Sequence, residues 1–549
     1  MSTGQFPAHL LATYEKERLL IAQGVLVQTD TNTKVLVSNH TIMQCLREQV
    51  FQIRGNIMNE IVFKSVVDMV QMIRDRQISA VELLDAHLEQ IAQHNSKLNA
   101  ICTLDAEKAR TRAKQADEAL TKGEDWGALH GVPVTIKDIF ETAGLRTTAG
   151  YIPLRDYIPQ QDATVVARLR AAGAIILGKT NAAELAADYQ SINSLFSRVN
   201  NPWNLAYTPG GSSGGSAAAI TAGLSPLDLG NDFGGSVRQP AHFCGVYGLK
   251  STDRRISTAG MIPEVPGLPL CVRQMMTVGC FARSLEDIRL CFSLLTGADV
   301  RRPDVPPVPL DTPSGKALSD LKIAWIDEWS EVPVASAIRT AMQKTAQTLA
   351  NTGAKVERWL PQGFDTSKML NLYMRVAAYN NTYAQPRDRY NIRRSLELIA
   401  RTATQGDKKL RQLGDFSRFL PELLNPSLKG YFATLTERDR FIAQLDMALE
   451  SWDVWLVPVA ATAAFTHRPA WSAVEVDGRA YPYGVANGAY TMPFNLSGHP
   501  VIVIPMGQTQ NGLPIGIQIV GKRWKEMELM AIAQQLDQVI GTFQHPPGY

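Results

Sequence analysis

The chain has 549 residues, of which 45% are hydrophobic, enough to bury the core of a large globular protein. Its 55 lysine and arginine residues against 52 acidic residues leave a formal net charge of +3, so nothing indicates a nucleic-acid partner. The six cysteines include no C-x-x-C pair, which disfavours a disulfide framework or a zinc site and suits a reducing compartment. Because no run of about 18 apolar residues occurs, we expect a cytoplasmic protein that does not associate with a membrane.

The first 56 residues carry no motif and no helix-capping signal. A helical pattern of apolar residues becomes clear only in the segment that follows Met58. We therefore expect residues 1–56 to be an extension of unknown role and Met58 to be a workable start of the folded body.

Helix and strand patterns alternate along the next part of the chain. Ser79, with Glu82 three residues later, predicts a capped helix start in "ISAVELLDAHLEQ". The extended segment "GVPVTIKDIF" predicts a strand that places Lys137 and Asp138 on opposite faces. A helix over 162–172 and the apolar strand "AIIL" follow. Such alternation predicts an α/β fold.

Residues 301–315, "RRPDVPPVPLDTPSG", predict a proline-rich surface connection between two halves of the molecule. Beyond it, "LKIAWID", "VWLVPV", "PVIVIPM" and "PIGIQIVG" predict buried strands. Residues 365–450 are mainly helical and polar in pattern.

Two motif matches are misleading in their context. "GAIILGKT" satisfies the phosphate-binding pattern G-x-x-x-x-G-K-T, but its four intervening residues form an apolar run typical of a buried strand. "GSSGG" satisfies the nucleophile elbow G-x-S-x-G with Ser213 at its centre, but a loop rather than a strand precedes it. We expect Ser213 and Ser216 to satisfy the backbone of the turn instead.

A second glycine-glycine-serine occurs in "GNDFGGSVRQPAHFCGVYGLK", at 230–250. Together with "GVPVTIKD" and "GGSSGGSAAAI", in this order, it resembles the amidase signature family. The resemblance runs from about Glu60 to the end and includes "YTMPFNLSGHPVIVIPMG". It implies an α/β fold with a central mixed, twisted β-sheet surrounded by α-helices, in one catalytic domain over 57–549.

By this resemblance, the family's catalytic lysine corresponds to Lys137, its cis-linked serine to Ser212 and its nucleophile to Ser236. A serine hydroxyl attacks an amide only when a neighbour removes its proton, and a lysine can do so only when neutral. Lys137 must therefore lie where its pKa is lowered. Ser212 would relay the proton between Lys137 and Ser236.

The resemblance also assigns the oxyanion hole to backbone amides of the second glycine-rich segment: Phe233, Gly234, Gly235 and Ser236. It implies no metal and no cofactor. Arg238 is expected to pair with Asp232 or Asp228 and brace this loop, and Cys244 to be a packed thiol. Asn231 departs from the family, which more often has a small hydroxyl residue there.

The implied activity is hydrolysis of a carboxamide C–N bond through a serine acyl-enzyme, releasing a carboxylate and ammonia or an amine. One alternative is the glutaminase subunit of a tRNA-dependent amidotransferase, which the residues after Lys250 and the extra N-terminal segment disfavour. A nucleotide-binding or scaffold protein is the second alternative. We expect a small-molecule amide as substrate, and nothing in the sequence excludes a homodimer.

The helical region 365–450 is the expected place of the substrate pocket, because such folds vary around a fixed catalytic core. Tyr373, Tyr379 and Tyr383 lie in it. These tyrosines either contact substrate or pack between helices. With Phe233 near the nucleophile, the first possibility favours an apolar or aromatic acyl group.

Overall fold

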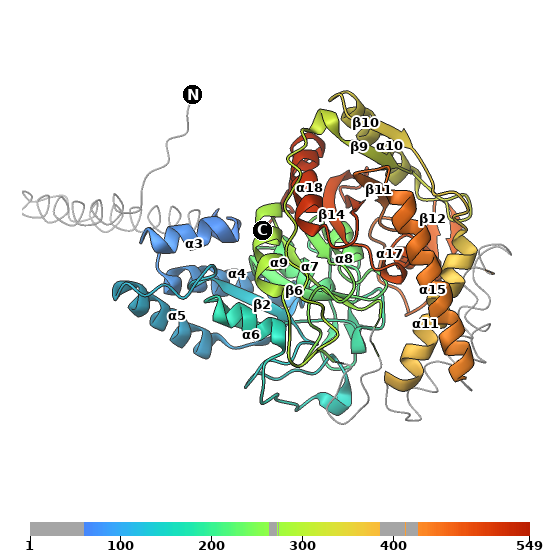
Figure 1. Ribbon diagram of the computed structural model, residues 1–549. Helices are drawn as coiled ribbons and strands as arrows, with labels where there is room; N and C mark the ends of the chain where they lie inside the picture. Colours follow the sequence, from blue (N-terminus) through green and yellow to red (C-terminus); the bar gives the residue numbers. More distant parts are fainter. Residues whose placement is uncertain (1–59, 263–271, 273, 385–411, 413–426) are drawn as a thin grey trace, which may run out of the picture.

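The computed structural model describes residues 60–262, 272, 274–384, 412 and 427–549. A large mixed β-sheet crosses this part of the chain and is surrounded by helices, as predicted (Figure 1). The expectations for residues 1–56 and for Met58 lie outside the described residues.

The sheet has eleven strands in the described part, in the order β1-β3-β2-β6-β8-β7-β14-β15-β11-β9-β10. Their bounds are β1 Ile101–Leu104, β2 Pro133–Lys137, β3 Ile175–Thr180, β6 Leu227–Asp232, β7 Tyr247–Lys250, β8 Thr277–Ala282, β9 Lys322–Trp325, β10 Lys355–Arg358, β11 Val454–Pro458, β14 Val501–Gln508 and β15 Pro514–Val520. Two small ribbons pair β4 Ile192–Asn193 with β5 Ser197–Arg198, and β12 Val474–Val476 with β13 Arg479–Tyr481.

The α-helices of the described part are α3 Val66–Arg74, α4 Ala80–Leu98, α5 Ala106–Thr121, α6 Thr164–Ala171, α7 Gly214–Thr221, α8 Arg238–Cys244, α9 Leu285–Leu295, α10 Ser336–Ala350, α11 Thr366–Ala384, α15 Leu428–Leu449, α16 Tyr483–Gly488, α17 Met492–Leu496 and α18 Glu526–Ile540. Three short 3₁₀ helices are η1 Ile152–Leu154, η2 Glu184–Ala186 and η3 Leu318–Asp320. Over the residues described, no helix combines the length and the apolar character needed to cross a membrane.

The two halves of the molecule join at the centre of the sheet. Strands β1 to β8 precede the proline-rich connection 301–315, strands β9 to β15 follow it, and β7 pairs with β14 antiparallel across the junction. The connection itself contains no helix or strand, as predicted.

Several local predictions are confirmed. Ser79 caps α4 in a reciprocal capping box with Glu82. Residues Ile175–Thr180 of the segment "GAIILGKT" form the fully buried strand β3, parallel to β2, rather than a phosphate-binding loop. The Nζ of its Lys179 donates to Thr142 Oγ1 at 2.9 Å, within the protein.

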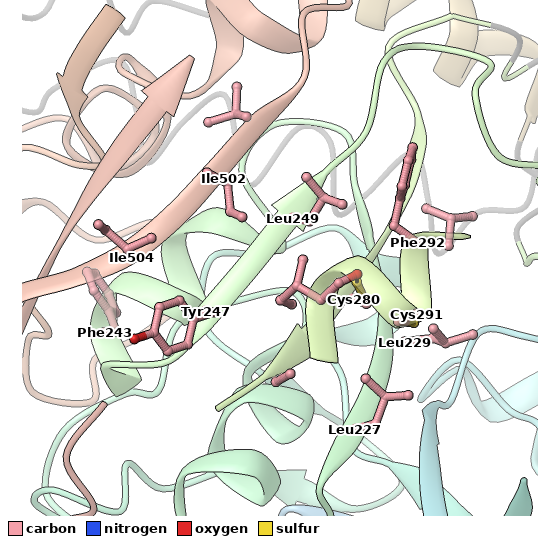
Figure 2. Close-up of a cluster of buried hydrophobic side chains, with 14 of the residues drawn as sticks. Leu227, Leu229, Phe243, Tyr247, Leu249, Cys280, Cys291, Phe292, Ile502 and Ile504 are labelled. Carbon is pink, nitrogen blue, oxygen red and sulfur yellow. Dashed lines mark hydrogen bonds between the residues drawn. The ribbon is translucent and has the colours of Figure 1, made fainter. Parts of the chain in front are cut away.

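Behind the central strands lies a continuous apolar core. Figure 2 shows part of it: Leu227 and Leu229 of β6, Leu249 of β7, Cys280 of β8 and Ile502 of β14 pack together with neighbouring side chains. All five are almost fully buried. This apolar packing fixes the positions of strands β6 and β7. The loop that follows β6 therefore begins at a rigid point of the fold.

The helical region 365–450 is confirmed as helical where it is described, in α11 and α15. These helices contact each other, and α11 also contacts α17. Side chains beyond position 380 on α11 and the segment before α15 lie outside the described residues.

Candidate active site

Two of the three predicted catalytic residues are in direct contact. Lys137 is the last residue of β2, and its Nζ lies 2.6 Å from Ser212 Oγ, in the loop before α7. The peptide bond between Gly211 and Ser212 is cis, as the resemblance implies. Ser236 lies in the loop between β6 and α8, and it is 8% exposed whereas Lys137 and Ser212 are completely buried. Of the three, Ser236 is thus the residue with access to solvent.

The Lys137 amine has three polar partners. Besides Ser212, its Nζ lies 2.8 Å from Ser213 Oγ and 2.7 Å from Asn231 Oδ1. Burial lowers the pKa of Lys137 well below its ordinary value, against the opposing effects of the Asp232 and Asp228 charges. The lowered pKa that a lysine base requires is therefore present.

The three oxygen partners can be satisfied by either form of the amine: the ammonium donates to all three, and the neutral amine donates to two and accepts from a hydroxyl. The neutral amine has two N–H donors and one lone pair, and an amide oxygen can only accept. Asn231 therefore takes one N–H, which leaves one N–H and the lone pair for the hydroxyls of Ser212 and Ser213. In this state the lone pair can receive a serine proton, which is the first requirement of a serine-lysine mechanism.

Asn231 and Ser213 are contacts of Lys137 that sequence reasoning missed. The prediction that Ser213 satisfies the turn backbone is wrong: its side chain makes no capping hydrogen bond to α7 and contacts Lys137 instead. The signal for Asn231 is its departure from the family pattern. The signal for Ser213 is its position next to Ser212.

Changing Asn231 to aspartate tests the neutral state of Lys137. The new carboxylate would lie at the site of an oxygen 2.7 Å from Nζ and would favour the ammonium form. We expect the acid limb of the kcat/KM profile to move up by about 1–3 pH units, with less activity at neutral pH. Asn231→Ser, which adds no charge, is the control. An unmoved acid limb would contradict a neutral Lys137 as the base.

Asp138 points away from the site, as predicted. Its carboxylate accepts from the backbone N–H of Thr148 at 3.1 Å and from the Thr148 hydroxyl. The charge next to Lys137 in sequence is therefore directed to the other face of β2.

An ion pair braces the loop that carries Ser236. Arg238 donates to Asp232 through Nε at 3.0 Å and Nη2 at 2.8 Å, and both side chains are fully buried. Burial raises the pKa of Asp232, but the charge and hydrogen bonds of Arg238 outweigh it and hold that pKa below its usual range. The predicted bracing role of Arg238 is confirmed. Cys244 is also confirmed as a buried thiol.

The Asp232 carboxylate also engages one of the four amides assigned to the oxyanion hole. The N–H of Gly235 donates to Asp232 Oδ1 at 2.9 Å. The amides of Phe233, Gly234 and Ser236 make no hydrogen bond within the described part of the chain. Three of the four expected donors are therefore unengaged, and Gly235 is the exception because its N–H caps the carboxylate.

The three candidate tyrosines differ in their surroundings. Tyr373 is buried, its hydroxyl donates to the Phe233 carbonyl at 3.0 Å, and its ring contacts that of Phe233. Tyr379 is buried against Tyr431 of α15, in the packing between the two helices. Tyr383 lies on α11, and its side chain is outside the described residues.

Comparisons with known proteins identify the family of the chain. The family described as Amidase matches residues 82–530. A glutamyl-tRNA(Gln) amidotransferase subunit of Alkaliphilus metalliredigens is 32% identical over 498 residues, covering 88% of this chain and 98% of that protein. The corresponding subunit of Anaeromyxobacter dehalogenans is 33% identical, covering 86% and 95%.

Solved structures agree as well. A 6-aminohexanoate cyclic dimer hydrolase with bound substrate has a TM-score of 0.70 at 26% identity, covering 87% of this chain and 97% of that one. A bacterial aryl acylamidase has a TM-score of 0.73 at 24% identity, covering 87% and 96%, a likeness of fold. The chain therefore belongs to the amidase signature family, whose members are enzymes that act on the carbon–nitrogen bond of amides.

Proposed function

We propose that Ser236 is the nucleophile, with Ser212 as proton relay and Lys137 as base. In this mechanism Ser236 Oγ attacks the amide carbon while its proton passes through Ser212 to the Lys137 lone pair. The carbonyl oxygen receives hydrogen bonds from the amides of Phe233, Gly234 and Ser236. The proton returns to the leaving nitrogen as the C–N bond breaks, and water then hydrolyses the acyl-enzyme by the reverse proton route.

The observation that carries this proposal is the triple contact of the buried Lys137 amine. This buried lysine has a lowered pKa and three neutral oxygen partners, and no carboxylate of the described residues contacts it to hold its proton. Lys179 and Lys250 are also buried with a lowered pKa, but each donates to at least one backbone carbonyl, whereas Lys137 contacts the hydroxyls of two serines. Its basic lone pair beside a serine hydroxyl is the feature expected of a catalytic base.

For the substrate, we infer that the chain releases ammonia from glutamine, as the glutaminase subunit of an amidotransferase. The support is the resemblance to the two amidotransferase subunits, each of which matches this chain over most of its own length and over most of the length of this chain. The comparisons favour this alternative over the stand-alone amidase with which the sequence analysis leads.

A specific observation keeps the stand-alone amidase as the second candidate. The aromatic rings of Phe233 and Tyr373 lie together at the loop that carries Ser236, with their centroids 5.8 Å apart. Aromatic surroundings suit an apolar or aromatic acyl group better than the charged head of glutamine. Either candidate takes a small-molecule amide. We also propose a cytoplasmic location and a single catalytic domain over 57–549. We further propose that the chain can form a homodimer.

Ammonia release separates the two candidates. The purified chain would be assayed with glutamine and with aryl and alkyl amides, alone and co-expressed with the other subunits of a bacterial glutamyl-tRNA(Gln) amidotransferase. We expect glutamine hydrolysis that is faster in the complex than with the chain alone and that disappears in Ser236→Ala. Turnover of aryl amides without glutamine hydrolysis in either state would favour the stand-alone amidase. Equal activity of Ser236→Ala and the parent would overturn the nucleophile assignment.

A further inference from the structure

The loop that carries Ser236 has every carbonyl from residue 232 to residue 235 held by a hydrogen bond. The Asp232 carbonyl accepts from Asn495 Nδ2 at 3.1 Å, and the Gly235 carbonyl accepts from the N–H of Gln239 at 2.8 Å. The two carbonyls between them are held by hydroxyl groups from distant parts of the chain. This set of contacts fixes the direction of each peptide plane in the loop.

The hydroxyl contacts come from three separate segments. Tyr373 of α11 donates to the Phe233 carbonyl at 3.0 Å. Tyr189, just after η2, donates to the Gly234 carbonyl at 2.9 Å, and Thr491, at the start of α17, donates to the same carbonyl at 2.6 Å. The Phe233 carbonyl thus depends on Tyr373 alone among the described side chains, whereas the Gly234 carbonyl has two donors.

The glycines of this loop are explained by these hydroxyls. A Cβ on Gly234 would lie 2.7 Å from the Tyr373 hydroxyl oxygen and 3.1 Å from that of Tyr189. A Cβ on Gly235, which has a φ of +121°, would lie 2.5 Å from Thr491 Oγ1. Side chains at these positions would push the hydroxyls away from the backbone. The glycines therefore permit close approach from behind the loop.

In a trans peptide the C=O and the N–H point in opposite directions. Because the Phe233 carbonyl points to Tyr373, the N–H of Gly234 points away from it and is left unengaged by the described residues. The next peptide shows the same rule: the Gly234 carbonyl points to Tyr189 and Thr491, and the N–H of Gly235 points to Asp232. The hydroxyls thus decide which amide of the loop is free to donate.

We propose that Tyr373 is a positioning residue of the oxyanion hole: its hydroxyl fixes the Phe233–Gly234 peptide so that the Gly234 N–H is directed at the carbonyl oxygen of the bound amide. Burial raises the pKa of Tyr373 well above its usual value, so the hydroxyl keeps the proton it donates. The inference rests on the proposed roles of Ser236 and its loop. It gives α11, in the region expected to shape the pocket, a part in orienting the catalytic backbone.

The test compares Tyr373→Phe with Tyr379→Phe, which removes a hydroxyl from the same helix where the ring packs on Tyr431. The readout is the second-order rate constant for labelling of Ser236 by a fluorophosphonate, which requires no knowledge of the natural amide. Loss of one oxyanion donor costs about 10²- to 10³-fold, and a loosened donor costs part of that. We expect labelling of Tyr373→Phe to slow by at least about tenfold, with Tyr379→Phe within about twofold of the parent.

Kinetics with any turned-over amide give the second readout. We expect Tyr373→Phe to lower kcat and leave KM within about twofold, because the lost interaction belongs to the transition state. Equal labelling and equal kcat in the two variants would overturn the role of Tyr373. An error in the nucleophile assignment would give a different result. Either the parent would not be labelled, or Ser236→Ala would be labelled as fast as the parent.

Melting temperatures of both variants separate positioning from simple destabilisation. Should Tyr373→Phe not fold, Thr491→Val is the second variant, because it removes one of the two donors to the Gly234 carbonyl. We expect slower labelling in it too, by a smaller factor, since Tyr189 keeps its contact. Unchanged labelling in a folded Thr491→Val would then count against control of the loop by hydroxyl groups.

Discussion

Replacing Lys137 with methionine should lower kcat/KM for amide hydrolysis by about 10²- to 10⁴-fold, the range that general acid–base catalysis contributes in enzymes. Methionine fills a similar apolar volume and has no lone pair of comparable basicity, so Ser212 and Ser236 would lose their proton acceptor. Lys179→Met is the matched control, because it removes another fully buried lysine, one strand away on β3. A folded Lys179→Met should keep its activity.

The same substitution should change how stability depends on pH. Because burial lowers the pKa of Lys137 in the folded protein, the unfolded chain binds this proton more readily. The parent should therefore lose stability as the pH falls from 10.5 toward the lowered folded pKa, by about 1.4 kcal/mol per pH unit. Lys137→Met lacks this contribution, so its free energy of unfolding should depend less on pH in that window.

Urea unfolding of both proteins at several alkaline and neutral pH values measures this difference. Parallel curves would mean that Lys137 has an ordinary pKa in the fold and is protonated at neutral pH. Lys137 would then be protonated at neutral pH and could not act as the base, so the proposed assignment would be wrong. The kinetic and the equilibrium experiments thus test the protonation state of Lys137 independently.

The fold was predictable from the sequence because its elements have strong local patterns. The strand β3 was recognisable from its apolar run, even though the segment matches the phosphate-binding motif at every position. The capping box of Ser79 and Glu82 was recognisable from two residues at the correct spacing. The alternation of such elements predicted the α/β class, and the resemblance supplied the mixed sheet.

The contacts of the site were less predictable, because they depend on residues far apart in the chain. The direction of Asp138 followed from strand alternation alone. The contact between Lys137 and Asn231 joins β2 to β6, 94 residues away, and no local pattern indicates which rotamer reaches it. Ser213 looked like a turn residue because its type favours turns. Only the packed structure places its hydroxyl against the lysine.

The tyrosines show the same limit. Sequence spacing could not distinguish a pocket tyrosine from a packed one, and the structure gives Tyr373 and Tyr379 different neighbours on one helix. The hydroxyl of Tyr373 reaches a backbone carbonyl 140 residues earlier in the chain. Such a contact is set by how α11 packs on the catalytic half of the molecule, which is a tertiary property.

Replacing Arg238 with methionine should destabilise the protein by about 3–5 kcal/mol, the cost of breaking a buried ion pair and leaving one charge alone. Besides Asp232, the guanidinium donates to the Thr491 carbonyl at 2.8 Å and to Gln518 Oε1 at 2.9 Å. These contacts join the Ser236 loop to the second half of the molecule. Unfolding in urea measures the loss, and the remaining folded protein should be less active because its loop is no longer braced.

Arg339→Met is the matched control for the loss of an arginine ion pair. Its Nη1 lies 2.6 Å from Glu328 Oε2, but both side chains are partly exposed. Exposed pairs contribute about 0–1 kcal/mol, so this variant should unfold close to the parent. Equal losses of unfolding free energy in the two variants would show that burial does not increase the contribution of the Arg238 ion pair to stability.

The pH dependence of Arg238→Met identifies the charge that causes the loss. In the parent, the low pKa of Asp232 contributes stability that is present at neutral pH and lost in acid, below its ordinary value of about 3.9. In the variant the buried carboxylate loses its ion-pair partner and keeps only the charge of Lys250 nearby, so burial raises its pKa and protonation relieves the unpaired charge as the pH falls. The difference in stability between the two proteins should therefore be largest at neutral pH and become smaller as the pH falls.

Asp232→Asn combined with Arg238→Met should recover part of the stability at neutral pH, because the neutral amide leaves no buried charge unpaired. A double variant no more stable than Arg238→Met would attribute the loss to hydrogen bonds rather than to the unpaired charge: those of the guanidinium with Thr491, Gln518 and Asn495, and those that Asp232 accepts from the N–H groups of Gly235 and Val237.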